Sequence, residues 1–338
     1  MVDLDELRAE VEAELRRAVE EGGGRLSELY LYHMGFRDAQ GQRTMTARGK
    51  YLRPLFCLSV CLGLGGNYHQ ALPAAAALEI IHRTSLILDD IQDQGRERNG
   101  QPSVYAIWGA NQAINAGFAL SCYGRLAALR GYKYGLPDSQ TMAIMHVLEH
   151  AAIRLCQGQY LDMEFSTAAD TTLDDYMAMV GGKTAALFAA ACRTGAMAAS
   201  HRVDLWEAAG RFGHGCGVAF QAWDDYLGIW GDQQVGKPAN DLEEGKRSLP
   251  VVLGLALPDA PVLPMRTLRN CLAADARDKE MVQAMKDWLE ARGVRERTRQ
   301  MATALALDAR AQLKALRLAP EWYQVVDHMV EAVVNRVK

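Results

Sequence analysis

Apolar residues recur three and four positions apart along most of this chain, which is the spacing that predicts α-helices. Ala, Leu, Met and Arg dominate these segments, and all four favour helices. Sustained alternation of Val, Ile and Thr, which would predict β-strands, is absent. The longest mostly apolar stretches cover residues 111–130, 138–166 and 205–230. The pattern therefore predicts an all-α fold, built as a single large helical bundle.

Length and composition favour one domain with a large core. The 338 residues would suggest about two domains by length alone, but no linker rich in Ser, Gly and Pro divides them. Hydrophobic residues make up 49% of the chain, and the formal net charge of -4 argues against a nucleic-acid-binding surface. We expect a single domain over residues 1–338 that binds no nucleic acid.

The cysteines and the N-terminus predict a cytoplasmic protein. The seven cysteines form no CxxC pair, and most lie in apolar, helical stretches, as reduced core cysteines do. The first residues have the mixed charges of an amphipathic helix rather than the pattern of a signal peptide. No apolar run reaches the length of a membrane span, so we expect no stable membrane insertion.

The segment SLILDDIQD joins an apolar run to a tight group of carboxylates. Polar side chains gather on one side of the single helix expected here: His82, Ser85, Asp89, Asp90 and Asp93. Carboxylates one turn apart repel each other, and Mg²⁺, which prefers oxygen ligands and keeps substrate phosphates in its shell, removes that repulsion. Taken alone, the motif fits a solvated acidic helix end equally well.

A second acidic cluster favours metal binding. The segment FQAWDDYLGIWGD places Asp224 and Asp225 on another long helix, with Gln221 one turn earlier, among aromatic and aliphatic residues. Buried carboxylates are unfavourable unless they are paired or bind a metal. Two such clusters predict two walls of one pocket, which hold Mg²⁺ between them.

Several basic motifs supply cations for an anionic ligand of such metal ions. Arginine forks and lysine point charges are the usual ligands of a diphosphate, although each of these residues alone also fits an ordinary surface position. The cations are Lys50 and Arg53 in GKYLRP, Arg96 and Arg98 in RERNG, Lys183 in GGKTAALF, and Lys237, Lys246 and Arg247 in VGKPANDLEEGKRSLP. GGKT lacks the upstream glycine and the preceding strand of a P-loop.

Together with EIIHRTSLILDDIQD, WGANQAINAG and GQYLDMEF, these motifs resemble the trans-isoprenyl diphosphate synthases, the all-α enzymes that elongate prenyl chains. The resemblance runs from about residue 45 to 256, in the family's order and roughly its spacing. It implies an isoprenoid synthase bundle with a central apolar pocket, Mg²⁺ dependence and a homodimer. It also implies that an allylic diphosphate condenses with isopentenyl diphosphate to a longer all-trans prenyl diphosphate.

The resemblance implies roles for individual residues. Catalysis would involve Asp89, Asp90, Asp93, Lys183 and Asp224, and the metal ligands would be Asp89, Asp93, Asp224 and Asp225. The allylic diphosphate would be held by Arg98, Lys183, Thr184, Gln221, Lys237 and Lys246. Isopentenyl diphosphate would be held by Lys50, Arg53 and His82. Asn99 replaces the family's second arginine, so we expect a weakened donor site that Arg96 partly rescues.

The helix before the first acidic cluster predicts the product length. In the family, a bulky aromatic residue four or five positions before the first aspartate stops the chain short, whereas Thr84 and Ser85 are small. Alternatively, these two residues merely pack tightly against another helix. The pocket floor would involve Ile80, Ile81 and, from a neighbouring helix, Phe118 or Tyr123. We expect a twenty-carbon product, geranylgeranyl diphosphate, with a twenty-five-carbon product as the next alternative.

Two other functions remain open at this point. Asn99 also fits an enzyme of the same fold that ionises a diphosphate and then cyclises or couples it differently, but Lys50 and Arg53 argue against this because a cyclase needs no second diphosphate site. The other alternative is a non-catalytic subunit of a heteromeric synthase, which the intact Asp89 and Lys183 argue against.

Overall fold

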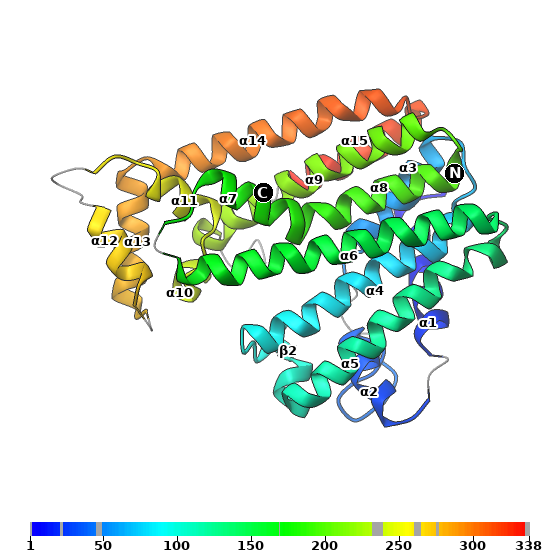
Figure 1. Ribbon diagram of the computed structural model, residues 1–338, viewed down its shortest axis with the longest axis horizontal. Helices are drawn as coiled ribbons and strands as arrows, with labels where there is room; N and C mark the ends of the chain where they lie inside the picture. The colour runs from blue at the N-terminus through cyan, green and yellow to red at the C-terminus, as the bar shows by residue number, and fades with distance from the viewer. Residues whose placement is uncertain are drawn as a thin grey trace. The chain divides into compact units, whose positions relative to one another are not determined.

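The computed structural model describes residues 2–20, 23–44, 49–168, 170–231, 239–259, 265–274 and 277–334. Helices dominate this part of the chain (Figure 1). Its two named strands, β1 (Glu97–Arg98) and β2 (Gln101–Pro102), form one short antiparallel pair. The predicted all-α fold is confirmed.

The described helices match the apolar pattern of the sequence. In chain order they are α1 (Leu4–Val19), α2 (Arg25–His33), α3 (Leu52–Gly63), α4 (Tyr68–Gln92), α5 (Val104–Leu129), η1 (Arg130–Tyr134), α6 (Asp138–Thr167), α7 (Leu173–Val180), η2 (Gly181–Ala185), α8 (Ala186–Ala199), α9 (Val203–Trp230), α10 (Asp241–Glu244), α11 (Leu249–Leu255), α12 (Met265–Leu272), α13 (Lys279–Ala291), α14 (Val294–Leu313), η4 (Lys314–Leu316) and α15 (Pro320–Val334). The three long stretches expected to be helical are α5, α6 and α9, and the first acidic cluster ends α4.

Backbone contacts divide the chain into two compact units. The first comprises residues 1–150, 190–210 and 318–322, and the second comprises residues 151–189, 211–317 and 323–338. Four helices, α6, α8, α9 and α15, therefore contribute residues to both units. The prediction of one domain over residues 1–338 stays a prediction.

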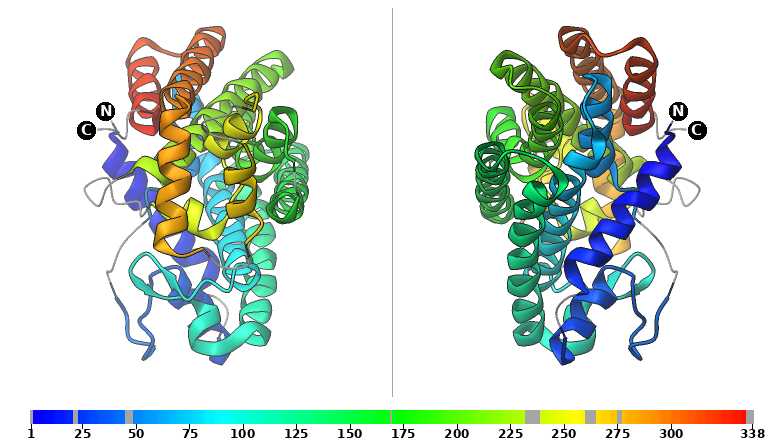
Figure 2. Two further views of the ribbon diagram at one scale, coloured as in Figure 1. Left: turned by 90° about the vertical axis from the view of Figure 1, so that its left-hand side faces the viewer. Right: turned by 90° about the vertical axis from the view of Figure 1, so that its right-hand side faces the viewer.

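In the first unit, α4 is a core helix that packs along α5 (Figure 2). Two glycines of α5 allow the close approach, because a Cβ atom at Gly117 or Gly124 would lie 3.3 Å from Leu88 or Ile80, respectively. Ile80 and Ile87 are completely buried. This packing makes α4 a rigid platform for the acidic cluster at its end.

In the second unit, α6 meets η2 in direct backbone contact. A Cβ atom at Gly158 would lie 2.0 Å from the backbone nitrogen of Lys183, and one at Gly182 would lie 2.7 Å from the carbonyl oxygen of Arg154. No side chain fits in either place. The two glycines therefore hold the backbone of Lys183 against α6.

Among the described helices, α4 is long and apolar enough to cross a membrane. The sequence pattern did not lead us to expect such a segment. Of its most apolar 18-residue window, 72% is buried inside the protein, as expected for the core helix of a bundle. Length and composition alone are therefore weak support for a membrane span here.

Candidate active site

The first acidic cluster lies at the C-terminal end of α4. Asp89 is half-buried, and Asp93, the C-cap residue, is exposed. The amide of Asp93 donates to the carbonyl oxygen of Asp89 at 2.8 Å, so the two side chains lie one helical turn apart. The two carboxylates occupy one face near the solvent, as their spacing predicts.

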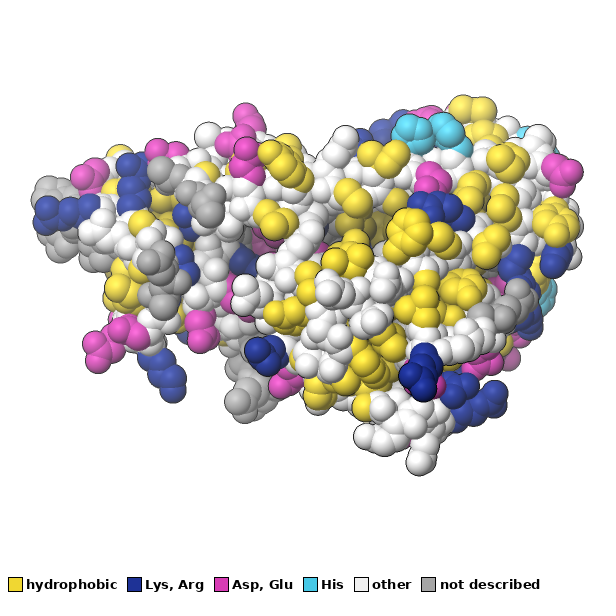
Figure 3. All heavy atoms as spheres, turned by 60° about the horizontal axis from the view of Figure 1, so that its bottom comes forward, with side chains coloured by type: hydrophobic (Ala, Val, Ile, Leu, Met, Phe, Trp, Pro, Cys, Tyr) yellow, Lys and Arg dark blue, Asp and Glu magenta, His cyan; other side chains and the backbone are white. Residues whose placement is uncertain are grey.

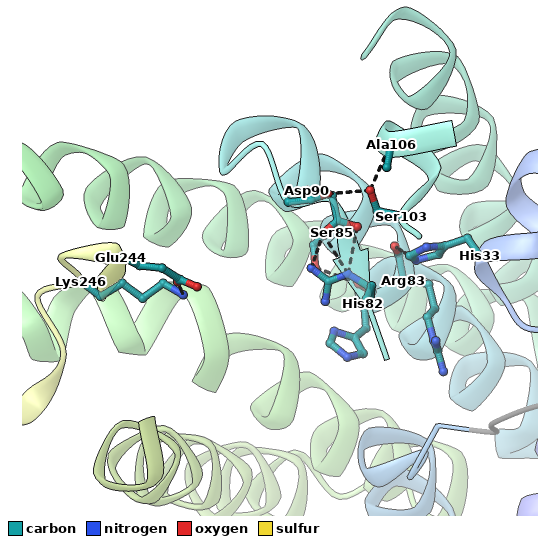
Figure 4. A network of polar contacts seen from close by, with 11 residues as sticks. His33, His82, Arg83, Ser85, Asp90, Ser103, Ala106, Glu244 and Lys246 are labelled. Atoms are coloured by element: carbon teal, nitrogen blue, oxygen red, sulfur yellow. Dashed lines mark hydrogen bonds and ion pairs between the residues drawn. The ribbon is translucent and has the colours of Figure 1, made fainter. Parts of the chain in front are cut away.

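Asp90 is buried and forms an ion pair with Arg98. Nε of Arg98 donates to the two carboxylate oxygens of Asp90 at 3.1 and 2.9 Å, and Nη2 donates to Oδ1 at 2.7 Å. Asp90 is 3% exposed, and Figure 4 shows it within a network of polar contacts. Asp90 thus positions the Arg98 guanidinium. This role differs from the catalytic role that the sequence predicted for Asp90 together with Asp89 and Asp93.

A tight hairpin explains Asn99 in structural terms. Asn99 and Gly100 connect β1 to β2 and both have left-handed backbone conformations, with φ of 53° and 75°. Two such residues in succession are typical of a type I′ turn, for which Asn-Gly is the favoured pair. Arg96, expected to compensate for Asn99, is exposed and lies just before β1.

The GKYLRP segment does not place its two cations on one helical face. Tyr51 has a left-handed backbone with φ of 48°, and α3 begins only at Leu52. Lys50 therefore precedes the helix and is exposed, whereas Arg53 lies in the first turn and is half-buried. Burial lowers the pKa of Arg53 to about 10, although the nearby Glu79 raises it.

Two histidines lie among the arginines of the first unit. Burial lowers the pKa of His82 well below its usual value, and the charges of Arg53, Arg83 and Arg98 lower it further. Burial also lowers the pKa of His33 to about 3, helped by the same arginines 83 and 98. Both rings are therefore neutral near pH 7, and Nε2 of His33 donates to the carbonyl oxygen of Arg83 at 2.9 Å (Figure 4).

Arg83 is a charged residue that the motif analysis missed. It is 6% exposed, and its Nε donates to Oε1 of Glu79 at 2.8 Å. It also lines an open pocket with His33, Arg98 and Asn99. The available signal was an arginine within an otherwise apolar helical run, directly after His82.

The second acidic cluster is part of a buried hydrogen-bond chain in the second unit. The hydroxyl of Thr184 donates to Gln221 Oε1 at 2.6 Å, and Gln221 Nε2 donates to Asp225 Oδ1 at 2.7 Å. Asp225 Oδ2 accepts from the hydroxyl of Tyr176 and from the amide of Leu249, both at 2.8 Å. Burial and the Asp225 charge raise the pKa of Tyr176 well above its usual value, so the phenol stays protonated and donates.

Asp224 and Asp225 have different surroundings. Asp225 is 5% exposed and both of its oxygens accept hydrogen bonds from the protein, which favours a positioning role over the predicted metal ligation. Asp224 is half-buried and is the better candidate for a metal ligand. A third carboxylate, which the motif analysis missed, comes from Asp241: a Cβ atom at Gly228 would lie 1.9 Å from its Oδ2.

Lys183 and Thr184 lie in the π-helical turn η2, which runs on from α7 into α8 without a break. The glycine pair Gly181–Gly182 lies in this widened turn, a feature frequent at functional sites. Nζ of Lys183 pairs with Asp162 of α6. Lys246 is half-buried and pairs with Glu244, and Lys237 lies outside the described residues.

The acidic residues fit a magnesium site better than a site in which the protein supplies every metal ligand. In the described part of the chain, no three His, Cys, Asp or Glu side chains lie together closely enough to hold a metal ion. Mg²⁺ usually takes one or two carboxylates from the protein and completes its shell with water and substrate phosphates. Asp89 and Asp93, one helical turn apart on α4 and partly accessible, match that requirement.

The residues expected to set the product length lie on α4. Thr84 is 9% exposed, and the hydroxyl of Ser85 donates to the carbonyl oxygen of His82 at 2.8 Å. Ile81 lies opposite Gly124 of α5, 3.6 Å from a Cβ atom built there. The assignment of Phe118 to the pocket floor is wrong, because this residue is 71% exposed.

The neutral His33 makes the stability of the first unit pH-dependent. Its pKa is about 3 in the fold and about 6.5 in an unfolded chain, so the unfolded state binds more protons between these values. The free energy of unfolding therefore falls as the pH drops from 6.5 toward 3. We expect the urea midpoint to fall between pH 7 and 5.5, and to fall less in His33→Gln. The exposed His201→Gln serves as control, and an equal fall in His33→Gln would contradict the assignment.

Comparison with known proteins finds relatives that match most of the chain. The polyprenyl synthetase family model matches residues 38–289. A geranylgeranyl diphosphate synthase of Mycobacterium tuberculosis is 37% identical over 256 residues, which cover 75% of this chain and 71% of that relative.

Two crystal structures share the fold. One is a polyprenyl synthetase from Streptomyces coelicolor A3(2), with a TM-score of 0.89 and 29% identity over 98% of each chain. The other is a geranylgeranyl pyrophosphate synthetase from Pyrococcus horikoshii, with a TM-score of 0.84 and 28% identity over 98% of each chain. The predicted isoprenoid synthase type of bundle is thereby confirmed. The chain belongs to the polyprenyl synthetase family, and it is a prenyltransferase.

Proposed function

We propose that the protein condenses an allylic diphosphate with isopentenyl diphosphate to a longer all-trans prenyl diphosphate, with geranylgeranyl diphosphate as the main product. The observation that carries this proposal is the combination of two acidic clusters with two separate sets of cations. Two of the similar proteins carry that product in their names, which supports the chain length.

The allylic diphosphate is the ligand proposed for the acidic clusters, Lys183, Thr184 and Arg98. Mg²⁺ held by Asp89, Asp93 and Asp224 would neutralise negative charge on the diphosphate leaving group. Arg98 is oriented for this task by Asp90. Lys246 and Lys237 remain proposed contacts of the same diphosphate.

The second set of cations is proposed to bind isopentenyl diphosphate. Lys50 and Arg53 supply positive charge, and the neutral ring of His82 supplies a hydrogen bond without a further charge. Two diphosphates of high charge are thus recognised by different residues.

The reaction follows from placing these two diphosphates in one dry pocket. The allylic C–O bond breaks, the electron pair leaves with the diphosphate, and a delocalised carbocation forms. The double bond of isopentenyl diphosphate attacks this cation, and loss of a proton from the new unit restores an allylic double bond. Apolar walls exclude water, which would otherwise capture the cation, and the buried face of α4 provides one such wall.

The two alternatives receive less support from the structure. The type I′ turn gives Asn99 a structural role, so this residue no longer favours a cyclising enzyme. A non-catalytic subunit would need no second set of cations. Mass analysis of products formed with each allylic diphosphate, with and without isopentenyl diphosphate, separates all three functions.

A homodimer in the cytoplasm completes the proposal. Exposed apolar side chains recur at helical spacing on α6: Met142, Ile153, Tyr160 and Met163. On α5, Ile114 and Phe118 are 49% and 71% exposed. Figure 3 shows hydrophobic side chains gathered on one face with few charges between them. Such a surface is typical of an interface between copies. Five buried free cysteines are consistent with a reducing compartment.

Neutralising one half-buried carboxylate should sharply lower turnover without unfolding the protein. We expect Asp89→Asn and Asp224→Asn to lower kcat by at least about a hundredfold, since each removes a proposed metal ligand, with urea midpoints close to wild type. Asp225→Asn should instead lower the midpoint, because its buried network loses charge-assisted bonds worth about 1.5–3 kcal/mol each. Near-normal turnover in Asp89→Asn or Asp224→Asn would reject their assignment.

A larger side chain on α4 should shorten the product. Each helical turn adds about 5.4 Å of depth, close to one isoprene unit, and Ser85 lies one turn before Asp89. We expect wild type to release twenty-carbon products and Ser85→Phe to release fifteen-carbon products, measured by chromatography of the dephosphorylated alcohols. Phe118→Ala should leave the length unchanged. A wild-type product of fifteen carbons or fewer would place the floor elsewhere.

A charge on the exposed face of α5 should weaken the dimer. Light scattering after gel filtration should give wild type twice the mass of one chain. Phe118→Glu should shift the protein toward monomer, because burying an unpaired carboxylate is unfavourable. Leu307→Glu, at a 59% exposed site on α14, is the matched control. A monomeric wild type, or an unchanged Phe118→Glu, would rule out this interface.

A further inference from the structure

Arg83 is a buried cation in the middle of the apolar core helix α4. Most charged side chains avoid such positions unless they are paired. Its guanidinium is paired through Nε with Glu79, one turn earlier on the same helix. A salt bridge of this kind contributes little to stability compared with apolar residues of similar size. Stability alone is therefore a weak reason for an arginine here.

The free edge of the guanidinium faces the GKYLRP segment. Nη2 of Arg83 lies 2.3 Å from the position that a Cβ atom would take at Gly49, so the group lies against the backbone directly before Lys50. Arg83 also lines the same pocket as Arg98 and Asn99. It therefore lies between the segment that carries Lys50 and Arg53 and the hairpin that carries Asn99.

Lys50, Arg53, Arg83 and Arg98 bring positive charge to this region. Asp90 pairs with Arg98 and Glu79 pairs with Arg83, and the charge of Glu79 also raises the pKa of Arg53. The histidines add none, because burial and the neighbouring guanidinium groups keep both rings neutral. The charge of Arg83 acts on the ring of His82, which places this guanidinium within the electrostatic range of the proposed donor site.

We propose that Arg83 binds the diphosphate of isopentenyl diphosphate and supplies the cation that Asn99 lacks. This inference rests on the proposed function and names a residue that determines how the donor is held. Arg96, the compensating residue expected from the sequence, does not line the pocket that contains Arg83, Arg98 and Asn99. An arginine on the core helix thus replaces an arginine on the hairpin.

The test must separate diphosphate binding from pairing with Glu79. Arg83→Gln alone leaves the Glu79 carboxylate buried without its partner, so the variant could fail to fold. The double variant Glu79→Gln/Arg83→Gln removes both charges, and Glu79→Gln alone keeps the guanidinium. For each folded protein, KM is measured for isopentenyl diphosphate at saturating allylic diphosphate and for the allylic diphosphate at saturating isopentenyl diphosphate.

We expect the double variant to raise KM for isopentenyl diphosphate about tenfold to hundredfold, the effect of losing one charge-assisted hydrogen bond. KM for the allylic diphosphate should change less than twofold, and Glu79→Gln, which keeps the guanidinium, should raise KM for isopentenyl diphosphate much less than the double variant does. A double variant with wild-type KM for isopentenyl diphosphate would mean that Arg83 only pairs with Glu79, and would overturn the inference.

A rescue experiment provides the second readout. Adding Asn99→Arg to the double variant should recover part of the lost affinity, because it restores a cation where the family has its second arginine. The left-handed backbone at this position makes the substitution modestly unfavourable for folding. Arg96→Gln should leave both KM values unchanged. A rise in KM for isopentenyl diphosphate with Arg96→Gln, and none with the double variant, would assign the role to Arg96.

Failure of the proposed function itself gives a different result. A wild-type protein that converts an allylic diphosphate without isopentenyl diphosphate, or that converts neither, would overturn the proposed function. A wild-type protein that elongates, together with an unaffected double variant, would overturn only the role of Arg83.

Discussion

The requirement that every buried charge has a partner organises the functional residues of this protein. In the first unit, Asp90 is compensated by Arg98 and Glu79 by Arg83. In the second, Asp225 accepts three hydrogen bonds from Tyr176, Gln221 and Leu249. These bonds are strong because the surroundings exclude water. They orient the groups that face the substrates without themselves needing access to solvent.

The same requirement explains why the two members of each adjacent aspartate pair differ in burial. Neighbours on a helix are separated by about 100°, so one member of each pair turns inward while the other turns outward. Asp90 and Asp225 are buried and hydrogen-bonded to the protein, whereas Asp89 and Asp224 are half-buried. A doublet that reads as two equivalent ligands thus supplies one residue that faces the ligand side and one that fixes local structure.

The fold could be predicted from the sequence because helical periodicity is local, and the long helices α4, α5, α6 and α9 show it plainly. Parts of the site could not. The left-handed backbone at Tyr51 separates Lys50 from the helix of Arg53, and no propensity rule indicates it. Arg83 was missed because an arginine beside a motif reads as a surface residue until its burial is known. Phe118 was assigned to the pocket because helical spacing does not reveal which face meets the core.

The π-helical turn Gly181–Ala185 holds one residue more than an α-helical turn would. Loss of a single residue there would convert the turn to ordinary α-helix, leaving every backbone hydrogen bond in α7 and α8 available. Because the wider turn accommodates the extra residue, the phase of α7 relative to α8 would change little, and the residues of the turn itself would be displaced. The glycine contact with α6 and the direction of Lys183 would then be incompatible. The segment is therefore intolerant of any change in its length.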